Sequence, residues 1–301
     1  SSFIKRFMEM AVIPYIEDKD AKLRAIDELP QSGKGKMIMT VEPKFIPNQA
    51  VEMLMDENFK VNVRLVDCVG YVIEGAKGYQ DDQGIRYVKT PWYLESIPFD
   101  QAAKVGTKKV IQDHSTIGIV ITSDGSICDI PGANYNEATD SIVEELLDID
   151  KPFIIIINTK DVNSSACKKE YERLTAKYDV PVLSMDVTNM EEPQIVSLLK
   201  DALYEFKISE VRIEVPKWLA MMSNSHWLKQ TLDTSLKESL QSIKKFKDVE
   251  RIGDTISEYD FVDKAYLTGI DTTTSSATLK IEEREGLYNE ILEEIIGDKG
   301  F

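Results

Sequence analysis

Apolar positions in the first two thirds of the chain form short strand-length runs that alternate with longer segments of helical spacing. The strand-length runs lie at 50–55, 61–67, 117–122, 153–158 and 180–185. The segments of helical spacing lie at 2–10, 135–147, 164–178 and 191–206. The first two runs are predicted to form a hairpin at the sheet edge that leads into a buried strand, and the almost wholly apolar run 153–158 is expected where both faces of a sheet are covered. The alternation predicts an α/β fold with a doubly wound, mostly parallel sheet.

The pattern changes after Phe206 and predicts a second, smaller domain. Short strands are expected at 211–215, 257–262 and 278–281, and a final short helix at 287–296. One long helix is predicted over 227–249, because apolar residues recur at helical spacing at Leu228, Leu232, Leu236, Leu240, Ile243 and Phe246. We therefore expect a larger α/β domain over 1–206 and a smaller α+β middle domain over 207–301.

Composition narrows the class of protein. The 301 residues are 43% hydrophobic and carry a net charge of −16, which disfavours binding to nucleic acid and to anionic lipid. No uncharged apolar stretch approaches the roughly 18 residues of a transmembrane helix. The three cysteines, at 68, 128 and 167, suit a reducing cytoplasm, and the two histidines cannot build a histidine-rich metal centre.

The strongest candidate for chemistry is the segment 65–70, in which a carboxylate ends a buried strand and the pattern D-x-x-G follows. This arrangement is typical of the second magnesium-binding motif of switch NTPases. Asp67 would lie beside the metal, usually through a water, and the Gly70 amide would meet the terminal phosphate. D-x-x-G also occurs by chance at ordinary strand-to-loop turns, so its position in the chain has to support the assignment.

The order of elements provides that support. Ser1 begins an amphipathic helix, as the last residue of a G-x-x-x-x-G-K-[ST] phosphate loop does; the Gly and Lys of that loop would precede it. A loop with Thr40 comes before the hairpin, where switch NTPases place a threonine that ligates magnesium when the terminal phosphate is bound. An ordinary loop threonine accounts for Thr40 equally well. Ser1, Thr40 and Asp67 are the candidate magnesium ligands, and Thr40 and Asp67 the candidate catalytic residues.

A candidate base-recognition loop follows the strand 153–158. Asn158 and Asp161 have the N-x-x-D spacing, but a guanine-specific loop has N-K-x-D, and Thr159 holds the lysine position while Lys160 is shifted by one. An aspartate accepts hydrogen bonds from guanine N1 and N2, which adenine does not offer. The identity of the base is therefore open, and a capped strand-to-helix turn is an equally good interpretation.

Tyr71 follows Gly70, where many small GTPases have a glutamine that orients the attacking water. An aromatic residue cannot make the same hydrogen bond, so hydrolysis is expected to be slow or to use another group. Lys77, Arg86 and Lys89 are candidates for a positive charge, although solvated surface positions explain them better.

Trp218 and Trp227 flank Met221, Met222 and His226. This composition favours the core of the second domain over a surface that binds a partner.

Longer runs resemble one family. They are 3–9, 27–32, 42–50, 65–71, 114–118, 202–206 and 224–228, and they cover essentially the whole chain. On these runs the chain resembles the stage IV sporulation protein A family of spore-coat morphogenetic ATPases.

The resemblance implies a P-loop NTPase domain like that of translation-factor GTPases, which hydrolyses ATP with Mg²⁺ and then self-assembles into the basement layer of the bacterial spore coat. It also implies a cytoplasmic location in the mother cell, on the surface of the outer forespore membrane. The implied partners are further copies of the protein, a small amphipathic membrane-anchoring peptide and other coat proteins, with only peripheral membrane contact and no nucleic acid.

By the same resemblance, Ser1 matches the phosphate-loop hydroxyl, Asp67 the metal-binding aspartate and Thr40 the first of two threonines that sense the terminal phosphate. Val41 stands in place of the second threonine. The phosphate-loop Gly and Lys and the family's C-terminal region are missing from the chain, which is expected to be inactive alone. Two alternatives are a nucleotide-independent scaffold with a degenerate NTPase fold and a guanine-specific regulatory switch.

Overall fold

The structure is a computed structural model that describes residues 1–30, 43–56, 59–68, 70–81, 84–90, 92–272 and 274–298. It is a mixed α/β protein that divides into two compact units. The first unit comprises Ser1–Met55 and Lys60–Ala202, and the second Asp56–Phe59 and Leu203–Phe301. Each unit is described by itself.

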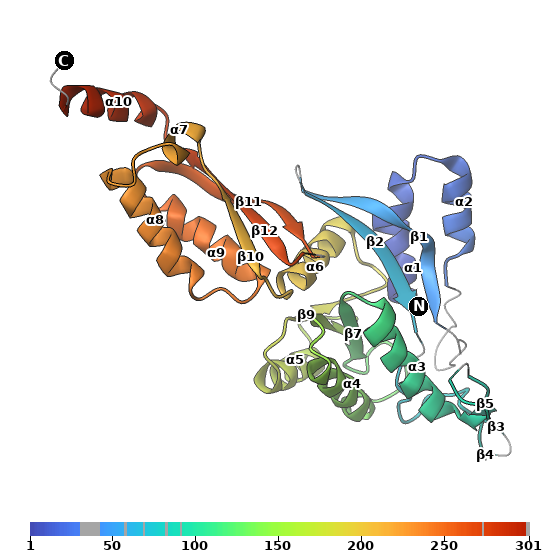
Figure 1. The fold of residues 1–301 in the computed structure, drawn as a ribbon. Coiled ribbons are helices and arrows are strands. Elements are labelled where there is room, and N and C mark those ends of the chain that lie inside the picture. Colours follow the sequence, from blue (N-terminus) through green and yellow to red (C-terminus); the bar gives the residue numbers. More distant parts are fainter. Residues whose placement is uncertain are drawn as a thin grey trace. The chain divides into compact units, whose positions relative to one another are not determined.

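The first unit contains a three-stranded parallel sheet, two short hairpin-like pairs, a long hairpin and the helices around them (Figure 1). Its helices are α1 (Ser2–Phe7), α2 (Lys19–Asp27), α3 (Phe99–His114), α4 (Asn136–Asp148), α5 (Ser165–Lys177) and α6 (Glu192–Tyr204). Its longer strands are β1 (Lys44–Asp56), β2 (Phe59–Asp67), β7 (Gly118–Ser123), β8 (Phe153–Asn158) and β9 (Val182–Met185). The short strands are β3 (Gln80–Asp81), β4 (Gly84–Ile85), β5 (Tyr87–Val88) and β6 (Ile97–Pro98). A π-helical turn (Met8–Val12) extends α1.

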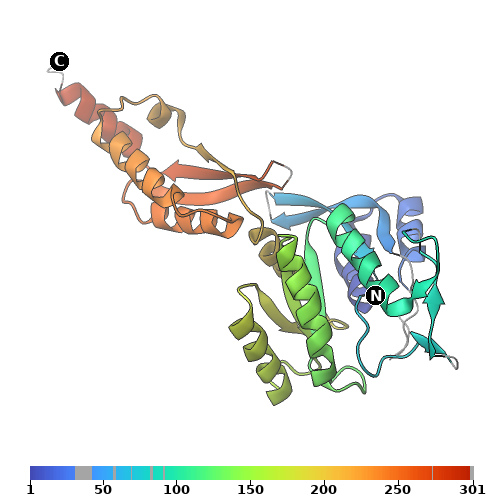
Figure 2. The same ribbon diagram turned by 60° about the horizontal axis from the view of Figure 1, so that its bottom comes forward.

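The parallel sheet has the order β7-β8-β9, and β8 is buried on both faces. On one face Ile154 and Ile156 pack in a core with α1, the π-helical turn and α6. On the other face Ile155 and Ile157 pack in a core with residues of α3, α4 and α5. Figure 2 shows α4 and α5 beside this sheet in a second view. The prediction that the run 153–158 is covered on both sides is confirmed.

The long hairpin differs from the prediction. Strands β1 and β2 form a two-stranded sheet of their own, and among the described residues no strand pairing joins them to β7-β8-β9. The expectation that the hairpin edges the main sheet is therefore wrong. Side-chain packing positions it instead, because Ile46, Met53 and Val63 lie in the same hydrophobic core as Ile154 and Ile156.

The second unit is a sheet of order β10-β12-β11 with helices packed on it (Figure 1). Its elements are β10 (Glu210–Glu214), α7 (Lys217–Ala220), α8 (Trp227–Leu240), α9 (Phe246–Ser257), β11 (Val262–Asp271), β12 (Ser276–Glu283) and α10 (Leu287–Asp298). Strand β12 runs parallel to β10 and antiparallel to β11. Helix α9 packs on β11 and β12, and Val249 and Ile256 of α9 and Leu279 of β12 are fully buried.

Two predictions in this unit are wrong. The long helix over 227–249 is two helices, because the carboxylate of Asp248 accepts the amides of Lys244 and Lys245 at 2.9 Å and so begins a new helix at Phe246. The strand expected at 257–262 is the end of α9 and a turn, and β11 begins only at Val262. The buried stripe of α9 continues through Ile256, which explains why the helix runs so far.

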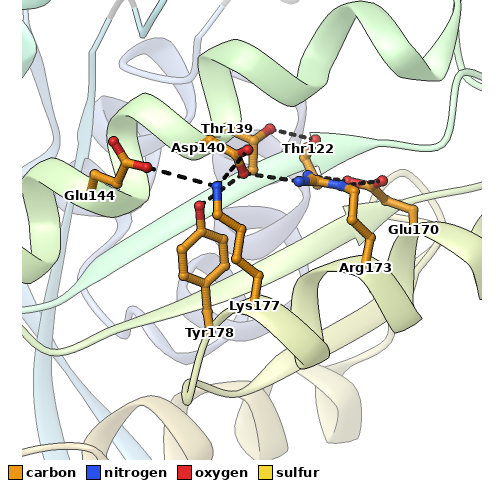
Figure 3. A network of polar contacts seen from close by, with 8 residues as sticks. All are labelled: Thr122, Thr139, Asp140, Glu144, Glu170, Arg173, Lys177 and Tyr178. Atoms are coloured by element: carbon orange, nitrogen blue, oxygen red, sulfur yellow. Dashed lines mark hydrogen bonds and ion pairs between the residues drawn. The ribbon is translucent and has the colours of Figure 1, made fainter.

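A polar network joins α4 to α5 on the outer side of the first unit (Figure 3). Arg173 and Lys177 point from α5 toward Asp140 of α4, at 2.9 and 2.8 Å, and Arg173 also holds Glu170. Beside this network, the hydroxyl of buried Thr139 donates to buried Thr122 of β7 at 2.9 Å. The network fixes α5 against α4, and α5 in turn begins at the loop that follows β8.

Candidate functional site

Ser1 and Asp67 lie in contact. Asp67 is the last residue of β2 and is 8% exposed, and the hydroxyl of Ser1 donates to its Oδ2 atom at 2.7 Å. The position of Ser1 is fixed by α1, whose Phe3, Ile4 and Phe7 are buried in the core. Two residues that the sequence proposes independently, 66 positions apart, therefore form one polar pair.

Of the residues directly after Asp67, the structure describes Cys68 and Gly70. Gly70 has a φ of 73°, in the left-handed region that favours glycine, and no described heavy atom lies within 4 Å of where a Cβ would be. Cys68 is half-buried, and burial followed by the charge of Asp67 raises the pKa of its thiol. The thiol is therefore neutral at physiological pH. The space beside the Cα of Gly70 is open.

Tyr71 is directed toward α3 and α4. Its hydroxyl is hydrogen-bonded to Glu145, and the Nζ atom of Lys108 lies 2.9 Å from the same carboxylate. Burial, then the hydrogen bond to Glu145, raise the pKa of Tyr71. A phenol held in this way does not take the place of a water-orienting glutamine beside Asp67.

The three candidate cations differ in their surroundings. Arg86 donates to the carbonyl of Gly78 at 2.6 Å and lies over the ring of Phe99, so it organises its own loop. Lys77 and Lys89 are both exposed. The structure brings none of these three into contact with Ser1 or Asp67 among the described residues.

Asn158 and Asp161 both lie at the carboxyl end of β8, but their side chains are engaged in local structure. The Oδ1 atom of Asn158 accepts the amide of Val187 at 3.1 Å, and the Oδ1 atom of exposed Asp161 accepts the amide of Asn163 at 2.9 Å. Thr159 between them is fully buried. A side chain at 159 therefore faces the protein interior and not a bound base.

Sequence reasoning missed Asp124, which follows β7 at the same edge of the sheet. Its carboxylate accepts hydrogen bonds from the hydroxyl of Thr159 at 2.6 Å and from the amide and hydroxyl of Ser126 at 2.9 and 2.6 Å. The hydroxyl of Ser164, at the start of α5, lies 3.5 Å away. The sequence signal was an aspartate directly after a buried strand, followed by Gly125.

The loop after Asp124 is closed by two glycines. Gly125 has a φ of 90°, and a Cβ there would lie 2.5 Å from the backbone nitrogen of Gly132; a Cβ on Gly132 would lie 2.6 Å from the carbonyl oxygen of Asp124. Real Cβ contacts are never this short, so the backbone approach requires glycine at both positions.

Thr40, the remaining candidate ligand, lies outside the described residues. Among the described residues no group of three or more His, Cys, Asp or Glu side chains is placed to hold a metal ion. The described helices also include none with the length and apolar character to cross a bilayer.

The aromatic and methionine cluster of the second unit is only partly core. Trp218 packs edge-on against Tyr288 and donates to Glu283, but Met221 is 86% exposed and Trp227 49% exposed. Trp218, Met221, Met222 and His226 line a groove of about 540 Å³ together with residues of α10. The prediction of a core cluster is wrong for Met221 and Trp227.

Comparison with known proteins identifies close relatives of both units. Sequence models of the stage IV sporulation protein A ATPase domain and middle domain match residues 1–207 and 208–299. The proteins of that name from Bacillus anthracis and Bacillus subtilis (strain 168) are 47% and 46% identical over 297 residues, and each match covers 99% of this chain and 60% of the relative. The protein from Clostridioides difficile (strain 630) is 41% identical over 299 residues, covering 99% of the chain and 61% of the relative. The chain thus spans about 60% of the length of these relatives. No solved structure matches it.

Proposed function

Because this chain belongs to the stage IV sporulation protein A family, we propose that it supplies the ATPase and middle domains of a sporulation protein that hydrolyses ATP to ADP and phosphate. The proposal includes a P-loop NTPase fold like that of translation-factor GTPases for residues 1–206. The middle domain would extend over 207–301.

The contact between Ser1 and Asp67 carries the proposal. In switch NTPases the phosphate-loop hydroxyl and the aspartate at the end of the neighbouring strand hold the same metal ion. Here the hydroxyl of exposed Ser1 and the carboxylate of buried Asp67 lie 2.7 Å apart. The hydrophobic core under α1 and β2 pre-organises the pair.

The two side chains fit Mg²⁺. Magnesium prefers oxygen ligands and is usually held by one or two side chains together with substrate phosphates and water. The hydroxyl of Ser1 and the carboxylate of Asp67 are such donors, and the space beside the Cα of Gly70 is open. When bound, the metal would neutralise charge on the phosphates. Thr40 is proposed as the further ligand.

We propose ATP as the substrate in preference to GTP because the side chain of Thr159 is buried. In a guanine-specific loop the residue at this position is a lysine whose stem lies along the base. Here the side chain points inward and its hydroxyl is bonded to Asp124 at 2.6 Å. Asp161 remains exposed, so we propose that Asn158 and Asp161 border the base without enforcing guanine.

For the full-length protein we further propose polymerisation into the basement layer of the spore coat, driven by ATP hydrolysis. It would act in the mother-cell cytoplasm at the outer forespore membrane, with a small amphipathic anchoring peptide and other coat proteins as partners. The family name supports the role in sporulation on which this proposal is built.

Replacement of Asp67 tests the ATPase proposal. Asp67→Ala in the full-length protein is expected to abolish hydrolysis, a loss of about 100-fold or more, because removal of a group that stabilises the transition state costs this much. Phosphate release measures the rate, and circular dichroism reports the fold. Asp179→Ala, at an exposed position of the same unit, is the matched control and should retain full activity.

Normal turnover by Asp67→Ala would contradict the site assignment. A calorimetric titration of the wild type with Mg²⁺ and ATP separates the ATPase from a nucleotide-independent scaffold, which would give no heat and no competition by ADP. Parallel assays with ATP and GTP address the guanine-specific switch, which would turn over GTP alone.

A further inference from the structure

We propose that Asp124 is a positioning residue that holds the loop 158–161 in shape to receive the nucleotide base, an inference that rests on the ATPase function proposed above. Asp124 is not among the residues that the sequence motifs identify. Its carboxylate lies at the carboxyl ends of β7 and β8, where it accepts from the amide and hydroxyl of Ser126 and from the hydroxyl of Thr159.

Each oxygen of the carboxylate serves a different segment. The Oδ1 atom accepts the amide of Ser126 at 2.9 Å and its hydroxyl at 2.6 Å, which folds the loop after β7. The Oδ2 atom accepts the hydroxyl of Thr159 at 2.6 Å and lies 3.5 Å from the hydroxyl of Ser164. One side chain therefore joins the end of β7, the end of β8 and the start of α5.

The backbone of the base loop depends on the partners of Asp124. The amide of Lys160 donates to the hydroxyl of Ser126 at 3.0 Å, and the amide of Asp161 donates to the hydroxyl of Thr159 at 3.2 Å. The hydroxyl of Thr159 also lies 3.1 Å from the carbonyl of Asp161. Loss of the carboxylate would thus release both hydroxyls that orient residues 160 and 161.

Asp124 is charged when it does this. Burial opposes ionisation, but the hydrogen bonds from Ser126, Thr159 and Ser164 outweigh it and hold the pKa of Asp124 below its ordinary value. Hydrogen bonds to an ionised acceptor are stronger than neutral ones, so the loop is held by charge-assisted bonds at physiological pH.

The role is separate from the metal and phosphate site. Within the described residues, the hydrogen-bond partners of Asp124 are Ser126, Thr159 and Ser164, and none of them contacts Ser1 or Asp67. The inference therefore predicts weaker recognition of the base while binding of the phosphates is retained.

Asp124→Asn in the full-length protein tests this. The substitution keeps the size of the side chain but replaces one acceptor oxygen by a donor group. The KM for ATP is expected to rise about tenfold, the size of one lost hydrogen bond to a charged group, with kcat within about twofold. Inorganic tripolyphosphate, which has no base, should inhibit the variant and the wild type with the same Ki.

Two further variants separate loss of this contact from a general loss of structure. Thr159→Val removes the hydroxyl and preserves the shape, so it should raise the KM for ATP in the same way, and the double variant should be no worse than the worse single variant. Asp248→Asn removes a carboxylate that accepts two backbone amides in the second unit and should leave KM unchanged, even if it lowers stability.

An unchanged KM in Asp124→Asn would overturn the inference, and so would equal weakening of ATP and tripolyphosphate, which indicates a general structural loss. A wild-type protein that does not hydrolyse ATP would overturn the proposed function and, with it, this inference. Wild-type hydrolysis with an unaffected variant would overturn the inference alone.

Discussion

Asp140 shows how a single carboxylate stabilises the first unit (Figure 3). It accepts hydrogen bonds from Arg173 at 2.9 Å, Lys177 at 2.8 Å and Tyr178 at 2.9 Å. Burial opposes its ionisation, but these three partners together hold the pKa of Asp140 below its ordinary value of 3.8. Since the folded pKa is the lower one, the charge stabilises the fold above pH 3.8, and this stabilisation is lost as the pH falls through the folded pKa.

Asp140→Asn is therefore expected to lower the free energy of unfolding at pH 7 by about 1–2 kcal/mol, as for the loss of hydrogen bonds to a charged group that is partly exposed. The difference from the wild type should shrink as the pH falls below 3.8, because the carboxylate is then protonated first in the unfolded and, at lower pH, in the folded protein. Urea unfolding at pH 7 and pH 3 measures it. Glu144→Gln, whose carboxylate lies 3.7 Å from Lys177 and is exposed, is the control with a small expected effect. A difference that stays constant with pH would contradict the charge-based explanation.

Some residues of the candidate site could be predicted from the sequence, and others could not. Ser1 and Asp67 were identified because each has a fixed place relative to a helix start or a strand end, and the structure brings them together. Asp124 was not predicted, because its role depends on a contact with Thr159, 35 positions away, and no local sequence pattern indicates that contact. Thr40 lies outside the described residues and stays a prediction.

At the scale of elements, hydrophobic spacing predicted which helices and strands exist better than it predicted where they begin and end. In the stretch 227–249 the apolar residues recur at helical intervals. The helix is nevertheless interrupted between Leu240, where α8 ends, and Phe246, where α9 begins. Periodicity alone does not detect a break whose cause is a capping side chain, here Asp248, that allows the apolar stripe to resume in the next helix. The separate pairing of β1 with β2 could not be predicted either, because strand partners are chosen by contacts remote in sequence.

Helix α9 packs on β11 closely enough to exclude a methyl group. A Cβ on Gly253 would lie 2.8 Å from the carbonyl oxygen of Ala265, a backbone atom that cannot move aside. Gly253→Ala should therefore lower the free energy of unfolding by about 1–3 kcal/mol, the usual effect of overpacking, despite the better helix propensity of alanine.

Gly297 of α10 is the matched control for this substitution. No described heavy atom lies within 4 Å of a Cβ there, so Gly297→Ala should be neutral or slightly stabilising. Denaturant unfolding of both variants measures the contrast. Equal effects at the two positions would contradict the packing argument.

At the scale of the whole molecule, the sequence predicted the mixed α/β character and a change of pattern after Phe206. The α/β character could be predicted because β8 is buried on both faces, so that the run Phe153–Asn158 is almost wholly apolar. The second unit was harder to predict, because β11 has mostly half-buried positions and so lacks a clear alternation.

The carboxylate of Asp124 has a consequence for the motions of the first unit. Backbone amides of Ser126, Lys160, Asp161 and Cys167 donate to Asp124 itself or to a hydroxyl that bonds to it. An opening that breaks this shared anchor exposes all four amides to solvent at once. They should exchange with deuterium at a common rate, although they belong to three separate segments, and four unrelated rates would show that the segments open independently.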